Sequence, residues 1–386
     1  MARRDRRIAE LLKQRRVLRR QLQVLQQVLQ REVAALTEEL DRARQANLEL
    51  TQANRGLSHA AELVVRVEDP RPPRIRRLLS GPVVPSFHRH VMATRRLAGV
   101  AGSMPEGTRG LFHQVPRKLD SYRFAAGHGV APPGVFEWWQ DLAEIPWSDL
   151  PEEFVLKADG GAAGRAVQPL RRSAGDYQLV DGSRRFSPED LRAHWEGLAR
   201  TRAARPPYFA EELLADRHAA VVPVDVKIFT FYGQVAQVLL RRIRDVGRTD
   251  TADFRYLLPD GNPLTPEHWR RRQTLDIPVP EQLPEMVRIA GQLSAAVPLP
   301  FVRVDLYDVP QGVVFGELTT APGGSRAFSK GHDAALGRMW EEAQVRLQLD
   351  LIDGRPFGML PGPHPAELRR VAGRRLGAAQ AGRWTG

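Results

Sequence analysis

The stretch RVDLYDVPQGVVFGELT, residues 303–319, constrains the fold more than any other part of the chain. Residues 301–307 and 313–319 are rich in β-branched and aromatic side chains, which are typical of β-strands. Residues 308–312, between them, contain the proline and glycine expected of a short hairpin connection. The sequence therefore predicts two antiparallel strands joined by a tight turn.

A turn centred on Gln311 sets the register of this hairpin. Because side chains alternate along a strand, Asp305 then faces Glu317 directly across the two strands. The same register pairs Arg303 with Thr319 and Tyr307 with Phe315. Opposed carboxylates repel at the roughly 5 Å that separates facing Cβ atoms. Either one carboxyl is protonated, an arginine compensates, or a divalent cation lies between them; a solvent-facing hairpin with unrelated acids is the alternative.

Length and composition limit the classes of protein that remain. The chain has 386 residues, is 42% hydrophobic and contains seven tryptophans, so it can bury a core in one or two globular units plus an extension. The absence of cysteine excludes disulfides, thiolate metal sites and cysteine nucleophiles, and fits a cytoplasmic location. No apolar run reaches the length of about 18 residues that predicts a transmembrane helix.

The net charge of +12 comes largely from residues 1–20 and 365–386. Basic ends are compatible with acidic partners or anionic lipid, and equally with solubilising tails. Non-specific nucleic-acid binding predicts a strong salt dependence. No interleaving of aromatic and basic residues supports it, so we expect no specific nucleic-acid partner.

Residues 3–62 contain no proline and one glycine, and leucine recurs at heptad spacing with a four-residue step after Leu29. Asn47 and Asn54 fall at core positions, as in two-stranded parallel coiled coils. We expect this segment to form a homodimer, the alternative being one amphipathic helix packed on its own domain. Residues 63–86 are proline-rich and predict a linker.

Residues 87–360 mix predicted helices and strands, and residues 361–386 predict a basic, disordered tail. Three motifs precede the hairpin. Lys157 is followed by a glycine-rich loop between two predicted strands, which could cover phosphates or form an ordinary β-turn. The segment YFAEELLA places Glu211 and Glu212 before two leucines, either as a hinge for an adenine edge or as a helix start. The segment DVKIF places Asp225 and Lys227 on one strand face, where a simple salt bridge is the alternative.

In this order the motifs resemble the TupA-like ATP-grasp family, named for teichuronopeptide biosynthesis. The segments PRKLDSYRFAAGHGVAPP, LPEEFVLKADGGAAG, VDVKIFTFYGQVAQV and FVRVDLYDVPQGVVFGELTTAPGG carry the resemblance, over roughly residues 85–350. It implies an α+β ATP-grasp fold, in which two α+β subdomains sandwich ATP, preceded here by the coiled coil. The expected domain spans 87–360.

The resemblance also implies a role for each matching position. Nucleotide contacts fall to Lys118, Lys157, Gly160, Gly161, Gly164, Glu211, Glu212, Leu214, Asp225 and Lys227. Arg303, together with Lys227, is expected to stabilise the transition state. Asp305, Glu317 and Thr319 are expected to bind Mg²⁺, which would offset the repulsion of the facing carboxylates. The cofactors are therefore ATP and Mg²⁺.

Two positions depart from the family pattern. Asp159-Gly160-Gly161-Ala162-Ala163 stands where Asn-His-Gly-Ser-Gly is common, and Thr319 stands where many relatives have asparagine. The implied reaction is ATP-dependent ligation of a carboxylate to an amine through an acyl phosphate, on a cell-surface polysaccharide or peptide, or on a specialised-metabolite precursor. The alternative is an inactive ATP-grasp scaffold that dimerises and recruits a glycan-assembly partner. The arginines of LLRRIRDVGR, residues 239–248, could bind acidic substrates or form a solvated loop.

Overall fold

The computed structural model describes residues 84–104, 110–161, 166–217, 221–248, 251–264 and 273–371. The expected coiled coil, nearly all of the expected linker and the end of the expected tail lie outside this part of the chain. The described residues from Val84 onward belong to one compact unit.

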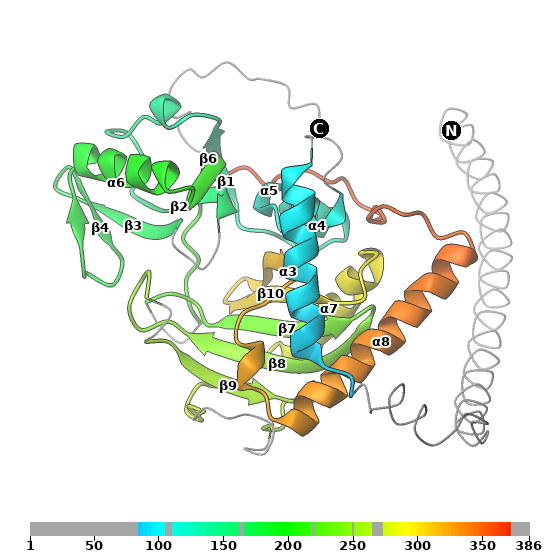
Figure 1. Cartoon of the computed structure of the whole chain (residues 1–386). Helices are drawn as coiled ribbons and strands as arrows, with labels where there is room; N and C mark the ends of the chain where they lie inside the picture. The colour runs from blue at the N-terminus through cyan, green and yellow to red at the C-terminus, as the bar shows by residue number, and fades with distance from the viewer. Residues whose placement is uncertain are drawn as a thin grey trace, which may run out of the picture. The chain divides into compact units, whose positions relative to one another are not determined.

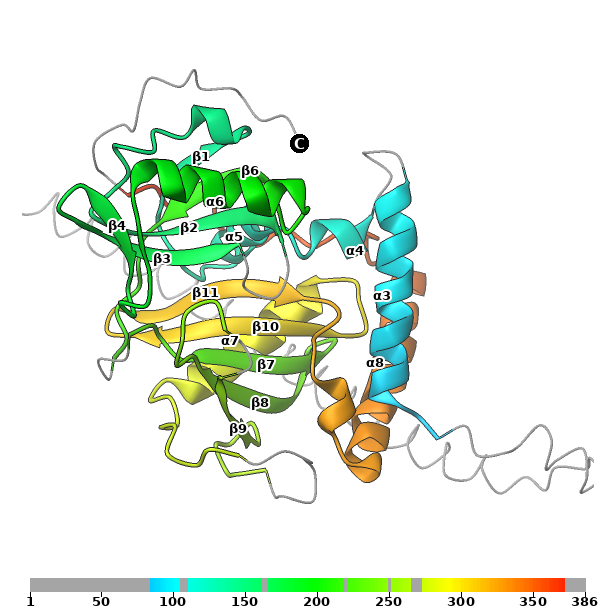
Figure 2. The same ribbon diagram turned by 60° about the vertical axis from the view of Figure 1, so that its left-hand side comes forward.

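Two antiparallel sheets organise this unit (Figures 1 and 2). The first sheet has the strand order β1-β6-β2-β3-β4-β5. Its strands are β1 (Val135–Trp139), β2 (Glu153–Gly161), β3 (Val167–Ser173), β4 (Asp176–Leu179), β5 (Arg185–Phe186) and β6 (Ala204–Glu211). Helix α6 (Pro188–Arg200) packs on this sheet through Leu191 and Trp195. Ser187 is the N-cap of this helix, and its hydroxyl accepts a hydrogen bond from the backbone N–H of Asp190 in a capping box.

The second sheet has the order β11-β10-β7-β8-β9. Its strands are β7 (Asp225–Phe231), β8 (Gln234–Arg242), β9 (Asp253–Leu257), β10 (Val302–Val309) and β11 (Gly312–Thr319). Strands β7 and β8 turn at Tyr232 and Gly233, which both have positive φ, as a two-residue hairpin turn requires. In this strand order β7 lies between β10 and β8, so Asp225 and Lys227 are on a central strand.

Helices cover the second sheet and fill the space beside it. Helix α7 (Leu283–Ala296) packs on one face, as Figure 2 shows. Helices α3 (Phe87–Ser103) and α8 (Lys330–Ile352) meet around Phe87, whose ring contacts those of Phe301 and Trp340. The remaining short helices are α4 (Leu111–Gln114), η1 (Leu142–Glu144) and η3 (Ser325–Ala327). Helix α5 (Lys118–Gly127) packs into a core shared by both sheets.

The β10–β11 hairpin has the expected register only at its open end. Asp305 pairs with Glu317 and Arg303 pairs with Thr319, as predicted. The expected pairing of Tyr307 with Phe315 is wrong, because the register shifts by one residue after Asp305 and Tyr307 pairs with Val314. The extra residue is Gly316, where a Cβ would lie 3.0 Å from both the Asp305 carbonyl oxygen and the Tyr307 ring. A β-bulge at a glycine accounts for the shift.

Candidate functional site

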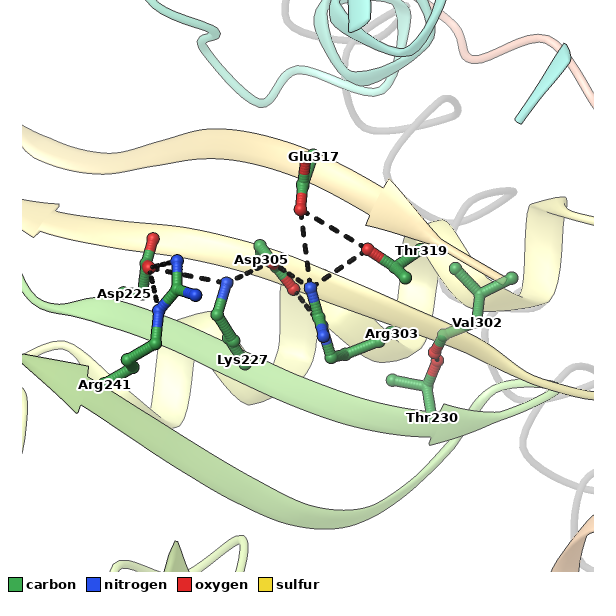
Figure 3. Close-up of polar contacts among 9 residues, drawn as sticks. All are labelled: Asp225, Lys227, Thr230, Arg241, Val302, Arg303, Asp305, Glu317 and Thr319. Carbon is green, nitrogen blue, oxygen red and sulfur yellow. Dashed lines mark hydrogen bonds and ion pairs between the residues drawn. The ribbon is translucent and has the colours of Figure 1, made fainter. Parts of the chain in front are cut away.

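Asp305 is the centre of a buried charge cluster on the second sheet (Figure 3). Its side chain is 2% exposed and accepts two hydrogen bonds of 2.6 Å from Arg303, one on each carboxylate oxygen. The Nζ of Lys227, on the neighbouring strand β7, also donates to Asp305 Oδ2. Burial raises the pKa of Asp305, although Arg303 and Lys227 oppose the shift. The arginine compensation that the sequence left open is therefore present.

Glu317 lies opposite Asp305 and is more accessible, with a side chain that is 40% exposed. Arg303 Nη2 lies 3.4 Å from Glu317 Oε1 and donates to Thr319 Oγ1 at 3.0 Å. Desolvation alone would raise the pKa of Glu317, but the positive charges of Lys227, Lys118 and Arg303 outweigh it and lower the pKa to about 2. Glu317 is thus ionised at neutral pH. Lys118 belongs to helix α5, so a positive charge on α5 helps to lower the pKa of a carboxyl group on the second sheet.

Asp225 holds Lys227 from the side opposite Asp305. Lys227 Nζ lies 3.5 Å from Asp225 Oδ2, and Arg241 Nε donates to the same oxygen at 2.7 Å. Although burial opposes the shift, Arg241 and Lys227 lower the pKa of Asp225. Asp225 is thus the salt-bridge partner of Lys227 that the sequence offered as one interpretation.

A second charge cluster lies on the first sheet, around Lys157. Lys157 Nζ forms an ion pair with Glu211 and also donates to the hydroxyl of Tyr122 at 3.2 Å. The Tyr122 hydroxyl donates to the other oxygen of Glu211 at 2.7 Å. All three residues are buried, with Glu211 2% and Tyr122 0% exposed. Burial raises the pKa of Tyr122 well above its ordinary value, and the carboxylate of Glu211 adds to the shift.

Sequence reasoning did not single out Tyr122 or assign a role to Asp159. Tyr122 follows Lys118 by four residues on α5, a spacing that places both on one helix face and that could have revealed it. Asp159 accepts hydrogen bonds from the backbone N–H of Leu119 at 2.9 Å and from Arg117 Nε at 2.8 Å. It thereby fixes the start of α5 on strand β2. Lys118, the first residue of α5, donates to the carbonyl oxygen of Ala158 at 3.2 Å.

The glycines after Lys157 lie differently from the expectation. Gly160 and Gly161 are strand residues of β2 that pair with Arg205 and Ala204 of β6, not members of a covering loop. A Cβ on Gly161 would lie 3.0 Å from the carbonyl oxygen of Ala203, so close strand packing explains this glycine. Gly164 lies outside the described residues.

The expected hinge continues from β6 as extended chain, and the helix start that was the alternative is wrong. Glu211 ends the strand, with its side chain engaged by Lys157 as above. The backbone N–H of Glu212 donates to the carbonyl oxygen of Gly134 at 2.8 Å. Among the described residues, Leu213 and Leu214 make no backbone hydrogen bond. Within that part of the chain, their N–H and C=O groups are therefore not engaged by another backbone group.

The two clusters meet through Tyr122 of α5. Its ring lies edge-on to Phe209 of β6 at 6.2 Å and to Phe315 of β11 at 6.1 Å between centroids. The structure thus gathers Lys157 and Glu211 of the first sheet and Lys118 of α5 opposite the carboxylates of the second sheet. Arg241 forms an ion pair with Asp225, and Arg242 and Arg244 form ion pairs with Asp253.

The hairpin also offers oxygen ligands of the kind that bind a hard cation. In the described ranges, no group of three or more His, Cys, Asp or Glu side chains is arranged to hold a metal ion. Asp305 and Glu317 supply two carboxylates, and Thr319 supplies a hydroxyl oxygen. Mg²⁺ commonly binds one or two carboxylates and takes its remaining ligands from water and substrate phosphates. The residues present therefore fit Mg²⁺ shared with a phosphate ligand.

Comparison with known proteins gave one family and several distant structures. The model of the family described as TupA-like ATPgrasp matches residues 112–341, more than half of the chain. No curated protein sequence matched significantly. None of the described helices is long and apolar enough to cross a membrane.

Solved structures similar to this chain include ligases and a synthetase. A D-alanine–D-alanine ligase from Bacillus anthracis is 14% identical, with 62% of this chain and 70% of that chain covered and a TM-score of 0.38. D-cycloserine synthetase DcsG is 17% identical, with 67% and 80% covered and a TM-score of 0.36. An L-amino acid ligase from Bacillus licheniformis is 13% identical, with 59% and 46% covered and a TM-score of 0.35. At such low TM-scores, the family assignment rests on the family match alone.

Proposed function

The chain belongs to the TupA-like ATP-grasp family, and from this premise we propose that it is an ATP-dependent carboxylate–amine ligase. The observation that carries the proposal is the pairing of Asp305 with Glu317 beside Arg303 and Lys227. Lys157 of the first sheet and Lys118 of α5 lie opposite this pair. Acids and cations alternate in this cluster, so it can accept a polyphosphate and its counter-ion without leaving a buried charge unpaired.

Each cation has a role that its position supports. Lys157 and Lys118 lie at β2 and the start of α5, where they can meet nucleotide phosphates. The adenine base would use the backbone of Leu213 and Leu214. Arg303, fixed by two hydrogen bonds, presents a planar guanidinium to a transferring phosphoryl group, with Lys227 as the second charge.

Asp305, Glu317 and Thr319 would hold Mg²⁺, which when bound neutralises charge on the transferring phosphoryl group. Glu317 contributes an ionised carboxylate that is partly open to solvent. Asp305 contributes a buried carboxyl group that Arg303 and Lys227 orient. Thr319 contributes only a hydroxyl, a weaker ligand than the amide oxygen found in many relatives.

The reaction forms two bonds in sequence. An oxygen of the substrate carboxylate attacks the γ-phosphorus of ATP, and the bond to the β-phosphate oxygen breaks to release ADP. The amine nitrogen then attacks the acyl carbon, and phosphate leaves as the amide forms and the amine loses a proton. Phosphoryl transfer relies on positioning and charge neutralisation, so no nucleophile from the protein is needed.

The acceptor we propose is a cell-surface polysaccharide or peptide, or a specialised-metabolite precursor. The test is ADP release that requires both a carboxylate and an amine, measured across pairs of uronic acids, amino acids and peptides. Arg303→Lys should retain nucleotide binding but lose most of the turnover, because lysine cannot make the two hydrogen bonds. Arg288→Lys on the exposed face of α7 is the matched control and should behave as wild type. ATP binding with no carboxylate-dependent ADP release from any pair would favour the inactive scaffold.

A further inference from the structure

Residues 359–371, here called the strap, lie beyond the family-matched region and pass beside the candidate site. In Figure 1 the strap is part of the orange-to-red trace that leaves α8 and reaches the first sheet near β1. The sequence placed residues 361–386 in a disordered tail. Residues 361–371 instead make specific backbone contacts, so this part of the expectation is wrong.

The first half of the strap is fixed on two helices. The backbone N–H of Leu360 donates to the carbonyl oxygen of Ala296, the last residue of α7, at 2.9 Å. The N–H of His364 donates to Gly127, the last residue of α5, at 2.9 Å. Between them, Gly362 packs so closely that a Cβ would lie 2.0 Å from the carbonyl oxygen of Gly127. Only glycine fits at this position.

The second half of the strap is fixed on the edge of the first sheet. The N–H of Val135 donates to the carbonyl oxygen of Arg369 at 2.7 Å, and the N–H of Val371 donates to Val135 at 3.2 Å. On its other side, Val135 pairs with Glu211 of β6. The strap, Val135 and Glu211 therefore lie in a row across the sheet, and the strap covers what would otherwise be an open edge.

The strap also contacts the hinge through a side chain. Arg369 forms an ion pair with the carboxylate of Glu212, which is partly exposed. The backbone N–H of Glu212 is held by Gly134, the residue next to the one that the strap binds. Glu212 is thus fixed by its backbone on Gly134, next to the residue that the strap binds, and by its side chain on Arg369 of the strap.

We propose that the strap is a positioning element for nucleotide binding, which holds Glu212 and so orders the backbone of Leu213 and Leu214 to receive the base. That the ligand is a nucleotide rests on the proposed function, whereas the ordering of the hinge does not. A hinge ordered before binding loses less conformational entropy when the ligand arrives, and the affinity is correspondingly higher. Arg369 is accordingly a positioning residue.

The test displaces the strap with a single methyl group in the full chain. Gly362→Ala places a Cβ against the Gly127 carbonyl, whereas Gly358→Ala, four residues earlier, meets nothing within 4 Å and is the matched control. We expect Gly362→Ala to bind ADP with Mg²⁺ about tenfold more weakly by calorimetry, the scale of one or two net hydrogen bonds. Gly358→Ala should bind as wild type does.

Hydrogen exchange without nucleotide separates this proposal from the proposed function. In Gly362→Ala we expect faster exchange at the amides of Val371 and Glu212, with the amides of β7 unchanged. Faster exchange at Val371 alone, with Glu212 as protected as in wild type, would overturn the proposal. Failure of the wild type to bind any nucleotide would contradict the proposed function. The exchange rate at Glu212 would still show whether the strap orders the hinge.

If Gly362→Ala does not fold, a charge reversal at the Arg369–Glu212 ion pair provides a second test. Arg369→Glu should speed exchange at Glu212 and weaken ADP binding, and the double variant Arg369→Glu with Glu212→Arg should recover both. Arg370→Ala removes a neighbouring arginine with no ion pair among the described residues and is the control. Failure of the double variant to recover either property would contradict the positioning role of Arg369.

Discussion

Removing the hydroxyl of Tyr122 measures how strongly the buried charges of the first sheet depend on it. Tyr122→Phe keeps the ring and its contacts with Phe209 and Phe315, so no large cavity forms. It removes the 2.7 Å hydrogen bond to Glu211 and the 3.2 Å hydrogen bond from Lys157. Hydrogen bonds to charged groups contribute about 1.5–3 kcal/mol, so the free energy of unfolding should fall by about 2 kcal/mol.

Tyr177→Phe is the matched control for this substitution. Tyr177 is also 0% exposed, but its hydroxyl accepts from a neutral donor, the backbone N–H of Leu150, at 3.2 Å. Hydrogen bonds between neutral groups contribute about 1 kcal/mol, so Tyr177→Phe should destabilise the protein by about half as much as Tyr122→Phe. Urea denaturation measures both, provided that the m-value stays constant. If Tyr122→Phe cost no more than Tyr177→Phe, the Tyr122 hydroxyl would not be held by the Glu211–Lys157 ion pair as the geometry indicates.

Three further predictions concern other parts of the chain. Neighbouring cations hold the pKa of Glu317 at about 2, below its ordinary 4.5. The stability that this carboxylate contributes is therefore present above pH 4.5 and is lost as the pH falls toward 2. Urea midpoints measured between about pH 5 and pH 2 should fall less steeply in Glu317→Gln than in wild type. Gly337→Ala should lower the melting temperature, since its Cβ would lie 2.4 Å from the backbone nitrogen of Ser86, whereas Gly331→Ala, in open space on the same helix, should leave it unchanged or raise it. The full chain should sediment as a dimer, and Leu25→Pro in the expected coiled coil should yield a monomer.

The sequence predicted the hairpin well because its determinants are local. Strand alternation and the short connection were enough to place Asp305 opposite Glu317. The same reasoning failed two residues further along, because the bulge at Gly316 depends on the ring of Tyr307 lying across the glycine. Glycine in a strand is a recognised sign of a bulge, so a signal was present in the sequence.

The contacts between distant segments could not be predicted in the same way. Tyr122 and Glu211 are 89 residues apart, and their hydrogen bond depends on how α5 packs between the sheets. The strap reaches β1 by two backbone hydrogen bonds at one residue, which leave no periodic pattern in a Pro-, Gly- and Arg-rich segment. Strand packing at Gly160 and Gly161 was likewise hidden, since glycine-rich sequence is typical of loops as well.

The central claim is that the facing carboxylates of the hairpin form a magnesium–nucleotide site with Lys157 of the first sheet and Lys118 of α5. Calorimetric titration of the full chain with ATP, with and without Mg²⁺, tests it most directly when wild type is compared with Glu317→Gln, which keeps the side-chain shape and removes the charge. We predict binding that requires Mg²⁺ in wild type and is lost or strongly weakened in Glu317→Gln. Equal affinity in both proteins, or no binding by a folded wild type, would contradict the claim.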